Sequence, residues 1–268
     1  MRTLRLSLAS IWMALLLLAS GMPALAKEIA VVGTGDGLDI LRSVAEAYGR
    51  ENPGTTFAVP PSIGSGGAIV AIGSNREVLG RVARPLTSSE AASGIQYRPV
   101  FNVPSAFFVH PGIQVRDLSA KQLLGIFAGV IVNWKEVGGP DLRIRVVRRE
   151  EADSSLLVFR TAIPEFRELK FTERSKLAVT TQDAIESIRE NPGGIGFASY
   201  SAVLARELGA VAINGVKPAD KGYPANVVLA LIFKQDRIDN DIRRFIDYFR
   251  SATARGIVES FGATPLHP

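Results

Sequence analysis

The start of the chain twice shows the same order of elements: an apolar strand, a loop of glycine and hydroxyl residues, and a helix. Residues 28–32 predict a strand, the loop Gly33–Gly37 follows, and apolar residues recur at helical spacing over 38–50. Residues 55–59 predict a second strand, which the loop Ser62–Gly67 joins to an apolar helix. Strands that alternate with helices pair in parallel sheets covered by helices, so this order predicts an α/β fold with a parallel sheet.

The same alternation continues to the end of the chain, without an internal repeat or a low-complexity linker. This pattern is compatible with two α/β lobes joined by short crossovers, although periodicity does not show where the chain crosses. The further strands are expected at 106–109, 144–147, 194–198 and 227–233, and the further helices at 119–128, 153–161, 181–190, 200–208, 240–252 and 255–261.

Residues 1–26 have the three parts of a secretory signal. Arg2 and Arg5 precede the apolar run Ile11–Leu18, and Ala24-Leu25-Ala26 offers a cleavage site before Lys27. The apolar run is shorter than the roughly 20 residues that cross a bilayer, so we expect cleavage rather than anchoring. The chain contains no cysteine, which excludes disulfides, thiolate metal ligands and a lipid-anchored cysteine. We expect an unanchored protein of the periplasm.

The net charge of +5 is modest and scattered along the chain. The arginine-rich stretch Arg143–Arg149 is followed at once by Glu150, Glu151 and Asp153. Such mixing is typical of a solvated surface with a site in it, and argues against a nucleic-acid-binding stripe.

Three loops open helices with small or hydroxyl residues: Gly33–Gly37, Ser62–Gly67 and Asp153-Ser154-Ser155. The N-terminus of a helix exposes unpaired N–H groups and the positive end of the dipole, which favours an anion. The alternative is that these serines and aspartates are ordinary N-caps. The first loop lacks the G-x-G-x-x-G spacing of a dinucleotide site.

Catalytic and metal-binding patterns are absent from the sequence. The two histidines, His110 and His267, lie outside any nucleophile motif, and no histidine or carboxylate cluster has metal-ligand spacing. We therefore expect a chain that is not an enzyme and that needs no cofactor or metal.

From residue 62 onward the chain resembles, motif after motif and in the same order, the phosphate-binding proteins of Pst-type ABC importers. The matching segments are Ser62–Gly67 (SIGSGG), Gly80–Leu86 (GRVARPL), Leu118–Leu123 (LSAKQL), Phe127–Gly129 (FAG), Asn133–Lys135 (NWK), Val146–Arg149 (VVRR), Asn191–Phe197 (NPGGIGF), Gly222–Pro224 (GYP) and Phe261–Leu266 (FGATPL).

This resemblance implies a type II periplasmic-binding-protein fold, with two α/β lobes that close on a ligand. After the signal sequence 1–26, one lobe is expected to comprise 27–103 plus 215–268, and the other 104–214. The implied partners are a small oxyanion and an inner-membrane ABC permease, with the protein as a monomer. Carried over by position, the implied ligand-binding residues are Thr34, Gly35, Asp36, Ser65, Gly66, Gly67, Arg84, Arg149, Asp153, Ser154 and Ser155.

The sequence departs from the family pattern at charged positions. Arg84 stands where the best-known members have an aspartate, Asp36 where a hydroxyl is expected, and Asp153-Ser154-Ser155 replaces Ser-Gly-Thr. A carboxylate in such a site can accept the proton of hydrogen phosphate and so reject sulfate. Phosphate is therefore the expected ligand, and the alternative is a binding or sensor module for another small polar solute.

Overall fold

The computed structural model describes residues 27–266. The expected signal sequence, residues 1–26, and His267 lie outside the described residues. Within 27–266, no helix is both long and apolar enough to cross a membrane.

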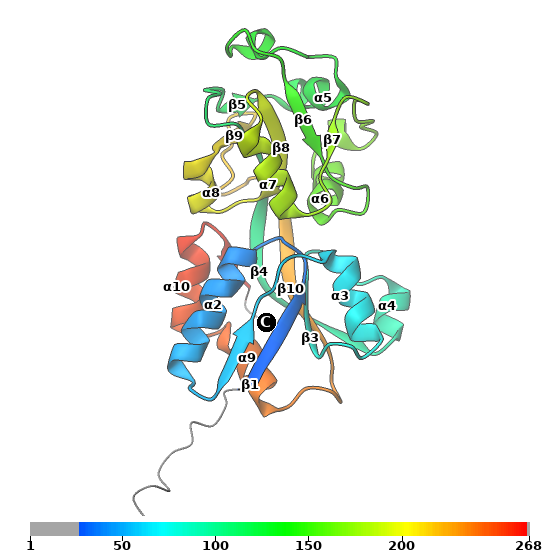
Figure 1. Ribbon diagram of the computed structural model, residues 1–268, viewed down its shortest axis with the longest axis vertical. Coiled ribbons are helices and arrows are strands. Elements are labelled where there is room, and N and C mark those ends of the chain that lie inside the picture. Colours follow the sequence, from blue (N-terminus) through cyan, green and yellow to red (C-terminus); the bar gives the residue numbers. More distant parts are fainter. Residues whose placement is uncertain (1–26, 267–268) are drawn as a thin grey trace, which may run out of the picture.

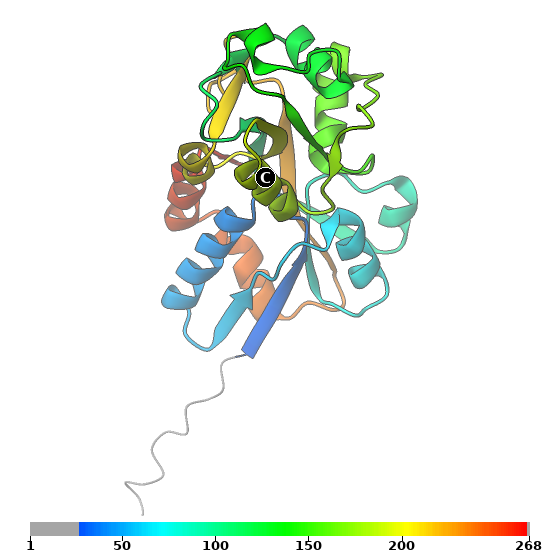
Figure 2. The ribbon, with the colours of Figure 1, turned by 45° about the horizontal axis from the view of Figure 1, so that its top comes forward.

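The described chain forms two α/β lobes, one above the other in Figures 1 and 2, with strands β4 (Ile95–Val109) and β10 (Asn226–Lys234) running between them. The lower lobe contains β1 (Lys27–Gly33), α2 (Leu38–Glu51), β2 (Thr55–Ala58), α3 (Gly64–Gly73), β3 (Leu79–Val82), α4 (Ser88–Ala92), α9 (Asn240–Tyr248), α10 (Ala252–Ser260) and β11 (Thr264–Pro265). The upper lobe contains β5 (Asp117–Leu118), α5 (Ala120–Ala128), η1 (Trp134–Val137), β6 (Arg145–Arg148), α6 (Ser154–Ala162), η2 (Pro164–Phe166), β7 (Lys176–Leu177), α7 (Thr181–Glu190), β8 (Gly194–Ser199), α8 (Ala202–Glu207) and β9 (Gly209–Ile213).

The strands pair in the order β2-β1-β3-β10-β4-β8-β6-β7, with β11 and β9 also on β4 and β5 on β9. Within each lobe the strands that precede helices pair in parallel, as β1 does with β2 and β3, and β6 with β7 and β8. Strand β10 is antiparallel to β3 and β4, and β4 is antiparallel to β8 and β9.

The parallel sheet predicted from the alternation is thus found only within each lobe, and the sheet as a whole is mixed. The chain enters the upper lobe along β4 and returns along β10, so these two adjacent strands run in opposite directions. The α/β class itself is confirmed, because helices alternate with most of the strands.

Each lobe has a core on both faces of its sheet. In the lower lobe, Tyr48 of α2 and Phe245 of α9 pack with Phe57, and the rings of Phe57 and Phe245 stack at 3.9 Å. A smaller cluster beneath α3 covers the other face. In the upper lobe, Phe107 and Phe108 point to opposite faces of β4, as neighbours on a strand must. Helices on both faces account for the runs of fully apolar strand residues.

The pairing of β4 changes at its middle. Residues up to Pro104 pair with β10, and residues from Ser105 pair with β8. Tyr223 and Ala225 pack in the core of the upper lobe before β10 begins at Asn226. These contacts favour a return crossing near residues 225–226, later than the expected boundary at 214–215. The division 27–103 plus 215–268 against 104–214 stays a prediction.

Candidate functional site

A polar cavity of about 210 Å³ lies where the two lobes meet. The lower lobe contributes the first loop and the start of α3, and the upper lobe contributes the loop between β6 and α6. The lining residues are Thr34, Ser62, Ile63, Gly64, Ser65, Gly66, Gly67, Arg149, Glu150, Ala152, Asp153, Ser154 and Val179.

Helix α3 points its N-terminus at this cavity. Ile63 N–H donates to Gly33 O at 2.9 Å, and Gly64 N–H donates to Ser62 Oγ at 3.2 Å. The N–H groups of Ser65 and Gly66, in the first turn, have no partner within the helix, because no preceding carbonyl is in reach. No acidic side chain lies in this first turn, so the positive end of the dipole faces the cavity.

Helix α6 meets the cavity differently, because Asp153 caps it. Asp153 Oδ1 accepts a hydrogen bond from Leu156 N–H at 3.1 Å, and its backbone is extended, as in an N-cap. The next residue, Ser154, lies at the cavity wall and is within 3.2 Å of Ser65 Oγ in the other lobe. The N-cap interpretation is thus correct for Asp153, and its carboxylate stands where an anion would meet this helix.

Arg149 brings a buried positive charge to the cavity. Its Nη2 lies 2.7 Å from Asp153 Oδ2, and both side chains are about nine-tenths buried. Among residues 27–266, no acceptor satisfies Arg149 Nε, which is buried. A buried donor without a partner is costly, so a ligand oxygen at this nitrogen would be stabilising.

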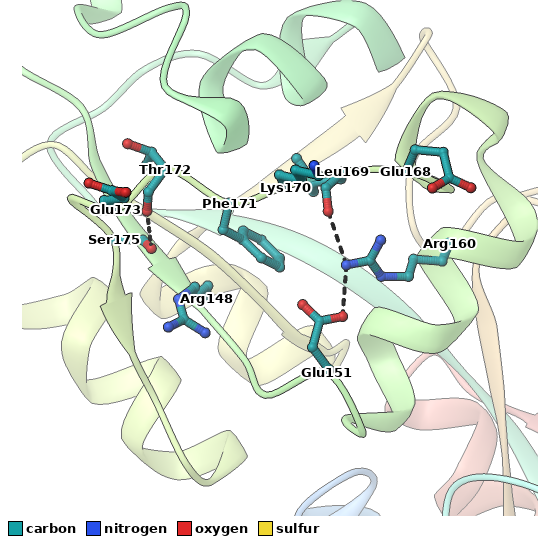
Figure 3. Close-up of a pocket in the computed structure, with 10 residues that line it drawn as sticks. All are labelled: Arg148, Glu151, Arg160, Glu168, Leu169, Lys170, Phe171, Thr172, Glu173 and Ser175. Carbon is teal, nitrogen blue, oxygen red and sulfur yellow. Dashed lines mark hydrogen bonds and ion pairs between the residues drawn. The ribbon is translucent and has the colours of Figure 1, made fainter.

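The neighbouring arginine lies elsewhere. Arg148 lines a separate surface pocket of about 540 Å³ on the upper lobe, together with Glu151, Arg160 and Phe171 (Figure 3). There Arg160 forms an ion pair with Glu151 at 2.8 Å and donates to Leu169 O at 3.0 Å. Of the two adjacent arginines, only Arg149 therefore reaches the polar cavity.

Asp36 lies behind the cavity wall and is 2% exposed. Thr34 Oγ1 donates to Asp36 Oδ2 at 3.0 Å, and Ser155 Oγ of the other lobe donates to Asp36 Oδ1 at 3.4 Å. Thr34 lines the cavity whereas Asp36 does not, so Asp36 contacts the wall of the cavity through the Thr34 hydroxyl.

The surroundings of Asp36 and Asp153 raise the pKa of both carboxylates. Burial, and next the charge of Asp153, raise the pKa of Asp36 to about 6, while Arg149 and the two hydroxyls oppose this rise. Burial also raises the pKa of Asp153, again against Arg149 and the backbone N–H groups at its cap. Both acids thus hold a proton more readily than they would in water.

Serines connect the lobes around the cavity. Besides the Ser65–Ser154 and Ser155–Asp36 contacts, Gly37 N–H donates to Ser199 Oγ at 3.2 Å across the interface. Ser105, on β4 where the lobes join, donates to Ser155 Oγ at 2.8 Å and is fully buried. Sequence reasoning missed Ser105, since a serine within an apolar strand carries no motif.

Four of the residues expected in the site, Gly35, Asp36, Arg84 and Ser155, do not line the polar cavity. Arg84 forms two 2.8 Å contacts with Glu90 and lines an apolar groove beside α6 instead. Gly35 contacts the start of α7, where a Cβ atom would come within 2.8 Å of Thr181 and Gln182. Seven of the expected residues line the cavity: Thr34, Ser65, Gly66, Gly67, Arg149, Asp153 and Ser154. Asp36 contacts the lining residue Thr34, and Ser155 in turn contacts Asp36.

Arg81, rather than Arg84, organises the lower half of the site. Its guanidinium is fully buried and donates to Thr34 O at 2.7 Å, Pro60 O at 2.8 Å and Val31 O. Burial lowers the pKa of Arg81 to about 10, which leaves it charged at neutral pH. The sequence feature that indicates the burial of Arg81 is its place in the otherwise apolar segment 79–82, because a charge buried in a strand needs hydrogen-bond partners.

No group of three or more histidine, cysteine, aspartate or glutamate side chains gathers into a metal-binding arrangement within residues 27–266. The donors at the cavity are N–H and hydroxyl groups, which match an anion.

Two α/β lobes that meet at a polar cavity define a two-lobed solute-binding protein. The model of the PBP superfamily domain matches residues 19–252, so the chain belongs to that superfamily.

Similar proteins agree with this assignment. The phosphate-binding protein PstS of Bacillus subtilis is 25% identical over 260 residues, covering 92% of this chain and 84% of its own. The PstS of Borreliella burgdorferi is 25% identical over 194 residues, which is 67% of this chain and 69% of its own. A Clostridium perfringens ABC-transporter substrate-binding protein, solved with bound phosphate, superposes with a TM-score of 0.79 at 23% identity. That superposition covers 90% of this chain and 100% of the other, and confirms the type II binding-protein fold.

Proposed function

We propose that this chain is a periplasmic solute-binding protein that captures a small oxyanion, phosphate, and delivers it to an inner-membrane ABC permease. The observation that carries the proposal is the interlobe cavity. It brings together the α3 N-terminus, hydroxyl groups from both lobes and a buried arginine with an unsatisfied Nε.

The relatives support phosphate as the ligand and import as the role. The Bacillus and Borreliella proteins are named for phosphate binding, and they match over most of this chain. A carboxylate beside the cavity, Asp153, supplies an acceptor that hydrogen phosphate can use and sulfate cannot.

The proposed function involves no catalytic step at this site. Its groups are donors and acceptors arranged around a space, and release after binding requires only that the lobes separate. Residues 1–26 would direct export and be removed before Lys27.

A thermal-shift panel tests the proposal, with phosphate, sulfate, molybdate, phosphonates and amino acids as separate additives. Phosphate at 100 times its dissociation constant should stabilise the folded protein by about 2.7 kcal/mol. Arg149→Ala should reduce this stabilisation to less than about 1 kcal/mol at the same phosphate concentration. A shift with an amino acid or sulfate but none with phosphate would contradict the proposal.

A further inference from the structure

The charges at the cavity do not suit a doubly charged anion. Two buried carboxylates, Asp36 and Asp153, face one arginine, Arg149, which is already paired with Asp153 at 2.7 Å. Glu150, also at the cavity wall, is exposed and adds a further negative charge.

The other nearby charges lie outside the cavity lining. Arg84 is bound to Glu90, and Arg81 lies behind the first loop with its guanidinium on backbone carbonyls. On the α7 side, Asp183 accepts from Val179 N–H and lies 3.9 Å from Lys176.

Asp153 also occupies the donors that an anion would use at α6. Its carboxylate accepts a hydrogen bond from the backbone N–H of Leu156 at 3.1 Å. The backbone N–H of Ser155 also favours the charged form and so opposes the rise in the pKa of Asp153. The positive end of this helix is therefore matched by an internal anion, and only α3 keeps its dipole for a ligand.

We propose that the cavity selects an oxyanion in its singly charged, doubly protonated form, dihydrogen phosphate rather than the dianion, and that Asp153 sets this preference. The inference rests on the proposed function. One P–OH group would donate to Asp153, and the unprotonated oxygens would accept from Arg149 Nε and from the N–H groups of α3. The monoanion adds one negative charge to the cavity instead of two.

The proton balance follows from this preference. Where phosphate in solution is mostly the dianion, each binding event must take up one proton from solvent. The raised pKa of Asp36 means that part of this proton can reside on the protein, so the uptake belongs to the ligand and carboxylates as a coupled set.

Calorimetric titration of inorganic phosphate between pH 6 and pH 8.5 measures this uptake, if each pH is run in two buffers of different ionisation enthalpy. We expect uptake of about one proton per phosphate at pH 8. The dissociation constant should rise about tenfold per pH unit above the second pKa of phosphoric acid. A constant affinity over this range, with no proton uptake, would overturn the inference.

Asp153→Asn tests the assigned residue. Asparagine caps a helix about as well as aspartate, so α6 should keep its start, but Arg149 loses its anionic partner. We expect this variant to bind phosphate about tenfold more tightly than the wild type at pH 8, with a flatter pH dependence, and to bind sulfate measurably.

Asp141→Asn is the matched control, because Asp141 is an exposed aspartate of the same lobe, paired with Lys135 on the surface. It should leave affinity and pH dependence unchanged. An Asp153→Asn protein that loses affinity equally at every pH and still excludes sulfate would overturn the role of Asp153. If the wild type bound no phosphate at any pH, the proposed function would fail as well, whereas binding without pH dependence removes only this inference.

Discussion

Asp36 is buried where water cannot solvate its charge, so its ionised form destabilises the folded protein. Its pKa is raised to about 6, whereas that of an unfolded aspartate is about 3.9. The folded state therefore binds more protons between these values, and stability is lost as the pH rises from about 4 through about 6. The difference corresponds to about 3 kcal/mol, and its largest cause is desolvation by burial.

Asp36→Asn should accordingly stabilise the unliganded protein at pH 7.5 by up to about 3 kcal/mol. An amide accepts from Thr34 or Ser155 without a charge to desolvate. Urea unfolding of both proteins at pH 7.5 and pH 4.5 measures the effect. The advantage should shrink at the lower pH, and an advantage that does not vary with pH would contradict the assignment.

At the scale of single residues, the sequence indicated which loops form the cavity. It did not indicate which of two nearby arginines would be buried beside it. Asp36, Ser65, Arg149 and Asp153 come together because loops that open neighbouring helices converge at the carboxyl ends of parallel strands. Arg81 and Arg84 lie three residues apart in one motif, and only packing decided which became buried. All four residues of β3 are buried and Arg84 lies beyond its end, so alternation along the strand did not single out Arg81.

The elements that carry the site depend on one close approach of backbone to backbone. Gly33, at the end of β1, has φ +146°, and a Cβ atom there would lie 1.9 Å from Arg81 O. That carbonyl also accepts from Thr34 N–H at 3.2 Å, so the contact fixes the start of the first loop.

Gly33→Ala should therefore destabilise the protein by more than about 3 kcal/mol, because it combines backbone strain with overpacking. Gly54→Ala is the control, since Gly54 also has positive φ, at +114°, but no atom within 4 Å of the added Cβ. It should cost about 1–3 kcal/mol. The midpoint of urea unfolding, at unchanged slope, reports both losses. Equal losses would show that the contact with Arg81 does not matter.

The helices of the chain were largely predictable from periodicity and caps, and the longest strand was not. Ser119 and Thr180 cap α5 and α7 close to the predicted starts. For β4 only residues 106–109 were expected, whereas the strand begins at Ile95. Prolines cannot donate to a sheet, yet β4 contains two of them. Pro99 lies beside a break in the register with β10, and Pro104 is the last residue to pair with β10 before the pairing with β8 begins at Ser105.

At the scale of the whole molecule, hydrogen bonds around the cavity join the two lobes, and these bonds must break if the lobes separate. They include the Ser65–Ser154, Ser155–Asp36 and Gly37–Ser199 pairs, each a single hydrogen bond between polar groups. The covalent links are the middle of β4 and the entry to β10, where Ser105 N–H donates to Ala225 O at 2.9 Å. Opening by a hinge at these two links would leave both cores intact.

We therefore expect the unliganded protein to populate a more open form and phosphate to close it. Small-angle scattering should show a smaller radius of gyration when phosphate is added at saturation. Sulfate at the same concentration serves as the ionic-strength control. Identical profiles with and without phosphate, at a concentration shown by calorimetry to saturate the protein, would contradict the hinge.

The central claim is that an anion binds between the lobes against Arg149. Calorimetric titration of phosphate at pH 6.5 into the wild type, Arg149→Ala and Arg148→Ala tests it most directly, because the two adjacent arginines lie in different pockets. Arg149→Ala should weaken binding by roughly 2–5 kcal/mol, the usual cost of truncating one partner of a buried charge pair. Arg148→Ala should change the binding free energy by well under about 1 kcal/mol. Equal losses in the two variants, or unchanged affinity in Arg149→Ala, would contradict this assignment of the site.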